Sequence, residues 1–201
     1  MEYNDYWDQI DHNLEELIDN GFSKLPSIKD FGLDKISESI SKEMGNKTFA
    51  DSCPSHKLFL DQLGIGKHLT PKLFSLAKNN FGYNGEIGDQ YHIARRVQKG
   101  NKSESFRSHF DSHLFTLVLP IKIPEVLNNN DTVGDLIFFP GLRKHPKNEV
   151  SNFINKLYFK KYASQKGVVE LSKKKAMHTE NFQSYQPLLF IGNTTLHTNK
   201  I

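Results

Sequence analysis

The chain has 201 residues and a single cysteine, Cys53, so no disulfide can form within it. Long apolar runs are missing too, and none approaches the length of a membrane-spanning helix. The first residues, MEYNDYWDQIDHNLEELID, are acidic and lack the apolar core of a signal peptide. These absences favour a reducing compartment, and the sequence predicts a cytoplasmic protein without a membrane partner.

A large excess of charge of one sign is also absent. The formal net charge of +3 is too small to argue for a nucleic-acid partner, and no nucleic-acid recognition motif is evident. Hydrophobic residues make up 37% of the chain and aromatic residues 11%, as in folded rather than disordered proteins. A chain of this length is expected to form one domain, 1–201, with a buried core.

Residues 1–85 have the apolar spacing of helices. We expect helices over 6–18, from about 34 to 44, and over 70–81, with Thr70 as the N-cap of the last one. A glycine follows each of these stretches, as is common at helix C-termini: Gly21, Gly45 and Gly82. This part of the chain is therefore predicted to be a helical layer.

The pattern changes after residue 86. Short apolar or alternating runs, separated by turn-forming residues, predict strands over 88–98, 113–121, 136–140 and 187–192. Several short strands after a helical layer indicate helices packed on an antiparallel sandwich or barrel. The expected fold is thus mainly β with flanking helices, and residues 86–201 form its core.

A lysine-rich segment, 143–186, interrupts this series of strands. Phe153, Leu157 and Tyr158 suggest an amphipathic helix within it. The simplest interpretation is a solvated helix and loop inserted between two strands. The functional alternatives are a mobile lid near the mouth of the barrel and an interface for an acidic partner.

The stretch SFRSHFDSHLFTLVLPIKIP, residues 105–124, carries the strongest functional signal. His109, Asp111 and His113 occupy every second position, and in a β-strand such residues project from the same face. Two imidazoles and a carboxylate in one shared space are costly unless a group such as a metal ion uses them.

Metal sites that activate dioxygen hold a redox-active ion by two histidines and one carboxylate on one side, with free positions on the other. His109 and Asp111 supply the first two ligands, and His197, which follows a buried strand, is the candidate for the third. His113 is interpreted as non-ligating, either donating to a ligand or lining the substrate entrance. The alternative for His109 and Asp111 is a hydrogen-bonded polar pair at a strand end.

The stretches RSHFDSHLFTLVLPI, GDLIFFPG and LLFIGNTTLH resemble the 2-oxoglutarate- and Fe(II)-dependent oxygenase superfamily, over residues 88–201. The resemblance implies a double-stranded β-helix, which is a cupin-like jelly roll. It also implies that His109, Asp111 and His197 are catalytic and bind Fe(II), which 2-oxoglutarate chelates as cosubstrate. The implied activity is a dioxygenase that hydroxylates a substrate and releases succinate and CO2.

One departure from the family pattern concerns the cation that pairs with the distal carboxylate of 2-oxoglutarate. In most relatives it lies on a further strand after the distal histidine, whereas this sequence has four residues after His197. Either the sequence is a fragment without its last strand, or the cation comes from elsewhere. An absent strand would leave an unpaired edge beside the strand of His197.

Arg95 is the internal candidate for this cation. It alternates with Tyr91, Ile93 and Val97 on the apolar, and therefore presumed inward, face of the strand predicted over 88–98. A guanidinium can bind both carboxylate oxygens and remains charged, and Tyr91 can donate a hydrogen bond to the same ligand. Lys122 is the second candidate, and the alternative role for Arg95 is an ion pair at the barrel rim.

Three functions therefore compete at this point. The first is an Fe(II)/2-oxoglutarate oxygenase, acting on a small molecule more readily than on a peptide by the superfamily's habits. The second is a catalytically silent jelly-roll module that binds a ligand or protein. The third is a cupin-like metalloenzyme in which His113 joins His109, Asp111 and His197 and no 2-oxoglutarate is used.

Overall fold

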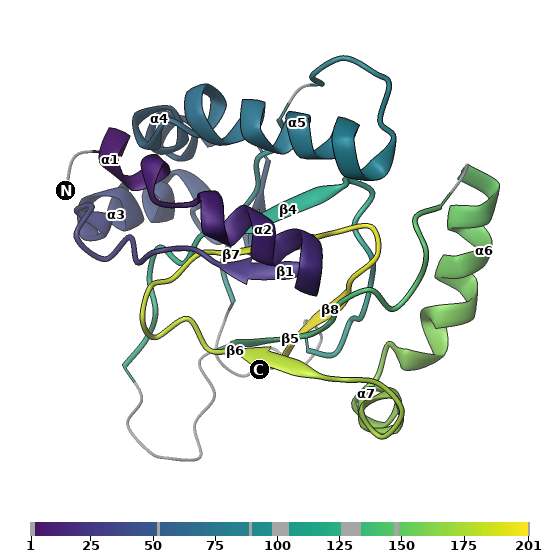
Figure 1. Ribbon diagram of the computed structural model, residues 1–201. Helices are drawn as coiled ribbons and strands as arrows, with labels where there is room; N and C mark the ends of the chain where they lie inside the picture. Colours follow the sequence, from purple (N-terminus) through teal and green to yellow (C-terminus); the bar gives the residue numbers. More distant parts are fainter. Residues whose placement is uncertain are drawn as a thin grey trace.

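A computed structural model describes residues 3–51, 53–88, 90–97, 105–125, 134–146 and 149–200. Within these ranges a mainly helical N-terminal part is followed by short antiparallel strands, then by a second, smaller group of helices and finally by three more strands (Figure 1). No helix in the described part of the chain is long and apolar enough to cross a membrane.

The predicted N-terminal helical layer is confirmed. Its elements are α1 (Tyr3–Asp8), α2 (Asp11–Asn20), α3 (Leu33–Met44), α4 (Pro54–Leu63), the π-helical turn η1 (Ile65–Leu69) and α5 (Thr70–Phe81). Apolar side chains of these helices form one buried cluster with β7, and Trp7, Leu17 and Leu63 are almost completely buried in it. Each such side chain stabilises the fold by roughly 1.5–3 kcal/mol relative to an exposed one.

The C-terminal ends of the helices lie where the sequence predicts them more often than the N-terminal ends do. Gly21 adopts a left-handed conformation (φ 79°) and its N–H donates to the carbonyl of Leu17, which ends α2 as predicted. The helix expected over 6–18 is divided in two, because α1 ends at Asp8. The N-cap prediction for Thr70 is wrong: helical backbone continues from η1 into α5, and the Thr70 hydroxyl donates to the Ile65 carbonyl at 3.1 Å.

Eight strands form three small antiparallel sheets among the described residues. The first sheet has the order β1-β7-β4, with β1 Phe22–Lys24, β7 Leu188–Ile191 and β4 Phe115–Val118. The second has the order β6-β5-β8, with β6 His178–Glu180, β5 Asp135–Phe139 and β8 Leu196–Lys200. β2 (Phe49–Ala50) and β3 (Ala94–Arg95) form the third. No closed barrel is present in these ranges, so the jelly roll stays a prediction.

The two three-stranded sheets pack face to face. Leu136 and Phe138 of β5 share a buried cluster with Leu188 and Phe190 of β7. Because successive strand residues face opposite ways, alternate positions contact the outer layers. Leu189 and Ile191 join the N-terminal helices, whereas Ile137 and Phe139 join a cluster that includes α7 (Gln165–Ser172). The layers are therefore helices, sheet, sheet and helices.

Both edges of β8 are paired in this arrangement. β5 lies along one edge, and the segment 106–109 hydrogen-bonds to the other through Phe106 N–H to Asn199 O at 2.9 Å and through a bridge between His109 and His197. The expectation of an unpaired edge beside the strand of His197 is therefore wrong. The chain that precedes Asp111 occupies that edge.

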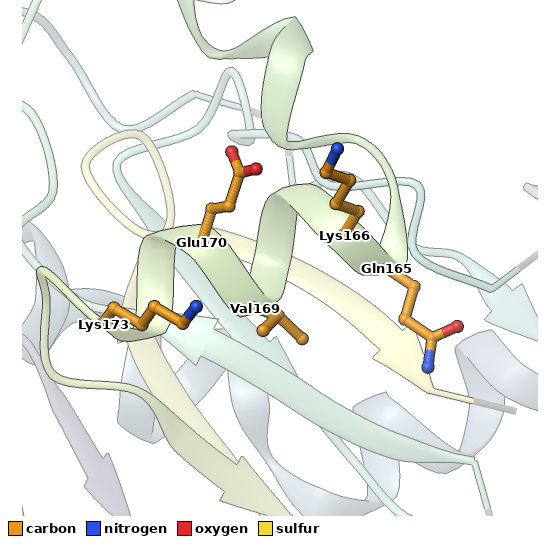
Figure 2. Close-up of a pocket in the computed structure, with 5 residues that line it drawn as sticks. All are labelled: Gln165, Lys166, Val169, Glu170 and Lys173. Atoms are coloured by element: carbon orange, nitrogen blue, oxygen red, sulfur yellow. The ribbon is translucent and has the colours of Figure 1, made fainter.

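The segment 143–186 contains the predicted helix, α6 (Glu149–Phe159), followed by the 3-10 turn η3 (Lys160–Tyr162), α7 and β6. α7 packs Val168 and Leu171 on the outer face of the second sheet. Its opposite side is open, where Lys166, Val169 and Lys173 help to line a shallow depression (Figure 2). This part of the segment is thus a structural layer, and α6 extends away from the sheets (Figure 1).

The strand expected over 88–98 is shorter than predicted and has the other face buried. β3 comprises two residues, and Ala94 packs in a buried cluster that contains Ile40 and Met44 of α3. Tyr91 and Ile93 are 57% and 37% exposed. The expectation that the face of Tyr91 is buried is therefore wrong, because packing on α3 selects the small side chain at the intervening position.

Candidate metal centre

Backbone pairing brings the two predicted metal-ligand segments together. The N–H of His109 donates to the carbonyl of His197 and the N–H of His197 to that of His109, each at 3.0 Å. The N–H of Asp111 donates to the carbonyl of Gly192 at 3.2 Å, in the turn before β8. Two segments almost 90 residues apart are thus held in register at the positions that carry the candidate ligands.

Alternation then places the candidate ligands on one side of this pairing. Phe110 joins the outer cluster with α7, so its neighbours His109 and Asp111 project from the opposite face. The ring of His197 lies 5.1 Å from that of Phe190 (centroid to centroid), which belongs to the cluster between the two sheets. The three side chains therefore meet at the inner face of the sandwich.

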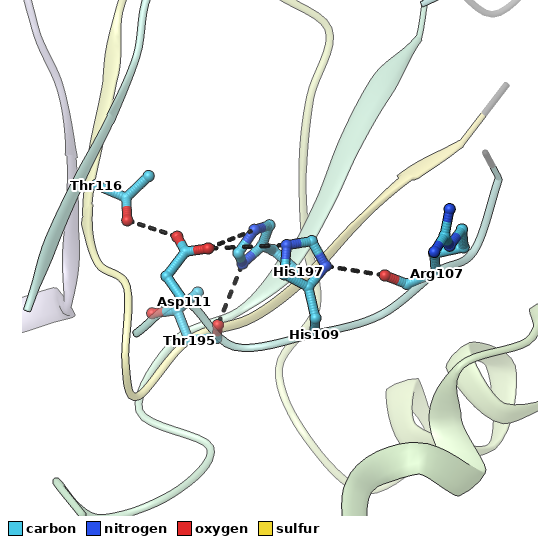
Figure 3. A network of polar contacts seen from close by, with 6 residues as sticks. All are labelled: Arg107, His109, Asp111, Thr116, Thr195 and His197. Carbon is cyan, nitrogen blue, oxygen red and sulfur yellow. Dashed lines mark hydrogen bonds and ion pairs between the residues drawn. The ribbon is translucent and has the colours of Figure 1, made fainter. Parts of the chain in front are cut away.

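The predicted convergence of His109, Asp111 and His197 is confirmed. One ligand atom from each lies within 4.8 Å of the other two. Oδ1 of Asp111 is 3.7 Å from Nε2 of His109 and 3.7 Å from Nε2 of His197 (Figure 3). His113 lies outside this group, because the chain bends after Asp111 and turns its ring toward solvent.

Hydrogen bonds orient each of the three side chains. Nδ1 of His109 lies 2.9 Å from the carbonyl of Arg107, and Nδ1 of His197 lies 3.3 Å from the carbonyl of Thr195 (Figure 3). Because a carbonyl can only accept, each Nδ1 carries the proton and each Nε2 keeps its lone pair.

The carboxylate of Asp111 is oriented in the same way. Its Oδ2 accepts a hydrogen bond from Thr116 Oγ1 at 2.5 Å, and its Oδ1 is directed toward both imidazoles. Such hydrogen bonds to the atoms behind the ligands are typical of metal sites, where they set the tautomer and orientation of each ligand.

Burial keeps His197 in the form that binds metals. Desolvation lowers its pKa from 6.5 to about 4; the nearby Asp111 carboxylate opposes this shift and His109 adds to it. The imidazole is therefore neutral at pH 7, with a lone pair on Nε2. His109 is half-exposed, so the site opens to solvent on its side.

The donor set fits a divalent transition metal. At metal–ligand distances of about 2.0–2.2 Å, adjacent ligands of an octahedral ion lie about 3.0 Å apart. The observed 3.7 Å separations would close by a few tenths of an ångström for each side chain. Two imidazole nitrogens and one carboxylate oxygen on one side leave other positions for water or substrate, which is the arrangement typical of non-haem Fe(II).

The structure also places the two arginines that the sequence singled out. Arg95 is exposed on β3, and its positive charge contributes to the lowered pKa of His197, so it lies near the triad. Arg96 points away: its guanidinium donates to the carbonyls of Gly45 and Ser41, at 2.7 and 3.2 Å, at the C-terminal end of α3. The predicted opposite directions of the two side chains agree with these contacts.

The other two candidates for the cosubstrate differ in their surroundings. The ring of Tyr91 stacks on that of His113, with centroids 5.5 Å apart and planes inclined by 14°. Both rings are exposed. Tyr91 is therefore the observed partner of His113, for which the sequence left two roles open. Lys122 is exposed beyond the end of β4.

Two residues of the site were missed at the level of sequence. Thr116 anchors Asp111, and Gly192 provides the space for this contact. A Cβ at residue 192 would collide with Thr116 Oγ1 and lie 3.0 and 3.1 Å from Cβ and Oδ2 of Asp111. Thr116 does not fall on the alternating positions that begin with His109 and Asp111, and Gly192 only follows a buried strand. The spacing of residues in the sequence therefore indicates neither role.

Arg143 holds the two ligand segments from the outer side. It is 8% exposed, its Nε donates to the carbonyl of Asn193 at 2.6 Å, and its guanidinium lies 4.0 Å from the ring centroid of Phe110. The Asn193 side-chain amide in turn donates to Nδ1 of His145 at 2.7 Å. The start of the lysine-rich segment therefore supports both Phe110, between the first two ligands, and the turn before β8.

Comparison with known proteins adds no family to this description. No family model, no curated protein and no solved structure matches the chain significantly. The function therefore has to be argued from the geometry of the site.

The contact from Thr116 leads to a first prediction. In Thr116→Val the shape of the side chain is kept, but Oδ2 of Asp111 loses its donor and the carboxylate loses its fixed orientation. We expect metal affinity to fall roughly 10- to 100-fold, as measured by competitive Co(II) titration. Thr179→Val, at an exposed position of β6, is the matched control and should leave affinity unchanged. Equal affinities in the two variants would contradict this role of Thr116.

The lowered pKa of His197 leads to a second prediction. The unfolded chain binds a proton at this imidazole below pH 6.5, whereas the folded chain binds it only below about pH 4. The metal-free protein should therefore lose stability as the pH falls from about 6.5 to 4, by up to about 3 kcal/mol from this residue. Urea unfolding of wild type and His197→Gln between pH 7 and 4 measures this loss. The variant should show a smaller pH dependence, and parallel curves would contradict the assignment.

Proposed function

We propose that this protein is an Fe(II)- and 2-oxoglutarate-dependent dioxygenase that hydroxylates a small-molecule substrate and releases succinate and CO2. The observation that carries the proposal is the convergence of His109, Asp111 and His197 at the inner face of a two-sheet sandwich, with both Nε2 atoms facing one carboxylate oxygen. The sandwich is compatible with the double-stranded β-helix of this superfamily, which the sequence stretches around these residues resemble.

Each residue has a defined task under this proposal. His109, Asp111 and His197 would hold Fe(II) from one side, and the iron would supply the redox chemistry that activates dioxygen. The neutral His197 imidazole and the oriented Asp111 carboxylate are ready to bind without a proton having to leave first. The apolar cluster behind His197, which includes Phe190, keeps water away from the inner side of the site.

The distal carboxylate of 2-oxoglutarate requires a cation, and we propose Arg95 for this role. It is close enough to the triad to influence His197, and a guanidinium can bind both carboxylate oxygens. Tyr91 lies three residues before β3 and can donate a hydrogen bond to the same ligand. The exposure of this face suits a residue that lines an open cosubstrate site. Lys122 is the second candidate.

The two competing functions have less support. A silent binding module has no need for a buried histidine, a half-buried aspartate and a second, half-exposed histidine whose Nε2 atoms both face one carboxylate oxygen. A cupin-like enzyme with four ligands requires His113 at the metal, whereas in the structure its ring stacks on Tyr91.

Turnover of the cosubstrate tests the proposed function. In the presence of Fe(II), 2-oxoglutarate and air, the protein should form succinate slowly even without its substrate. Omission of iron or oxygen should stop the reaction. Asp111→Ala, treated in the same way, should form none. Succinate formation at the same rate by wild type and variant, or its absence from both, would contradict the proposal.

A further inference from the structure

Helix α6 presents its apolar face to solvent. Phe153, Ile154, Leu157 and Tyr158 lie on one side of the helix, at positions i, i+1, i+4 and i+5, and are 55–62% exposed. An amphipathic helix of a globular protein normally packs this stripe on the core. Here α6 instead contacts the rest of the fold through Phe159 at its C-terminal end, whose ring lies 5.1 Å from that of Phe110. A contiguous exposed apolar stripe of this kind indicates an interaction surface.

Lysines surround one end of this stripe. Lys160 and Lys161 are exposed directly after α6, and Nζ of Lys161 lies 4.0 Å from the ring centroid of Tyr158. The described segment from α6 through α7 continues with Lys166 and Lys173, both exposed. A partner must therefore combine apolar side chains with negative charge.

A groove that combines apolar and acidic residues lies in the N-terminal part of the chain, between α2 and α5. Its volume is about 490 Å³, and it is lined by Asp11, Leu14, Glu15, Ile18, Asp19, Leu76 and Asn80. The three acids recur every four residues, so they form a row along one edge of α2. Asp11 is paired with Lys72, and Glu15 lies 3.7 Å from Nδ1 of His12 but is itself exposed, as is Asp19, so these two acids can reach a helix that lies in the groove.

We propose that α6 of one copy of this chain docks in the α2–α5 groove of a second copy. The dimensions agree: α6 has 11 residues and is about 16 Å long, and the acidic row spans about 12 Å. Leu157 and its apolar neighbours then contact Leu14, Ile18 and Leu76, while Lys161 lies near Glu15. This is the helix-in-groove mode of recognition.

The placement of the two surfaces favours a closed dimer. Figure 1 shows α6 on the same side of the molecule as the C-terminal ends of α2 and α5. Two copies related by a two-fold axis can therefore each place α6 on the partner's groove, so that both contacts form at once. The groove supplies the acidic and apolar partner within the same sequence, which favours a second copy over a lipid surface.

Sedimentation velocity over a concentration range of about 1–200 µM tests this proposal, because small interfaces give dissociation constants in this range. Wild type should pass from monomer to dimer. Leu157→Asp should weaken association at least tenfold, while Leu58→Asp, at a 59% exposed position of α4, should leave it unchanged. Far-UV circular dichroism verifies that both variants fold.

A charge exchange makes the test specific for the pairing of α6 with the groove. Lys161→Glu and Glu15→Lys should each weaken the dimer, and the double variant should restore it. A monomer at all concentrations, an unchanged dimer in Leu157→Asp, or a double variant no better than the single ones would each overturn the proposal. A monomer that sediments with phosphatidylserine vesicles would also overturn it and assign the face to a lipid surface. None of these outcomes depends on the metal centre.

Discussion

Replacement of Asp111 by alanine is expected to abolish metal binding while the fold stays largely intact. The variant retains both imidazoles, but it loses the carboxylate that faces both Nε2 atoms at 3.7 Å. We expect affinity for Fe(II), or for Co(II) as a spectroscopic substitute, to fall by roughly 100-fold or more, beyond the effect of removing an outer hydrogen bond. Anaerobic calorimetry with Fe(II) and Co(II) absorption spectra measure this loss.

The matched control for this variant is Asp30→Ala, which removes an exposed carboxylate far along the chain from the triad. It should bind metal as wild type does. Thermal unfolding of the metal-free proteins should show that both variants fold. A metal affinity of Asp111→Ala equal to that of Asp30→Ala would exclude Asp111 as a ligand.

Replacement of Arg95 by methionine is expected to raise the 2-oxoglutarate concentration needed for half-maximal succinate formation by roughly 10- to 100-fold. Hydrogen bonds to charged groups contribute about 1.5–3 kcal/mol, and methionine keeps much of the side-chain length without the charge. Arg95 is not among the three side chains that converge as candidate metal ligands, so its loss should act on the cosubstrate rather than on the iron.

Arg96→Met provides the control for this experiment because Arg96 is bound elsewhere. Its guanidinium donates to two carbonyls at the end of α3, so the variant should lose some stability but keep its requirement for 2-oxoglutarate. Equal behaviour of the two variants would show that the carboxylate is held by another residue, and Lys122 would be the next to replace.

The parts of the fold that the sequence predicts correctly follow from local rules. Helix ends at Gly21, Gly45 and Gly82 follow from the need for a left-handed residue or a break there. The alternation of His109, Phe110 and Asp111 predicted a shared side for the two ligands, and it holds because Phe110 has an apolar cluster to enter. The candidate metal centre was predictable for the same reason.

The parts that were missed depend on contacts between distant segments. Whether Ala94 or its neighbours face inward is decided by α3, which the pattern of 88–98 does not contain. Thr116 and Gly192 meet Asp111 because β4 and β7 pair, and Arg143 reaches Asn193 across 50 residues. For the lysine-rich segment a solvated insertion, a lid and an interface were all considered, and none of them anticipates that α7 within it covers the outer face of a sheet. Such roles follow from tertiary packing, not from spacing.

Anaerobic addition of Fe(II) and 2-oxoglutarate to the protein tests the central claim most directly. We expect a visible charge-transfer band that requires both components together and that is missing in Asp111→Ala. Metal binding that is insensitive to 2-oxoglutarate would contradict the claim in favour of a cupin-like metalloenzyme. Absence of metal binding would contradict it in favour of a binding module without catalysis.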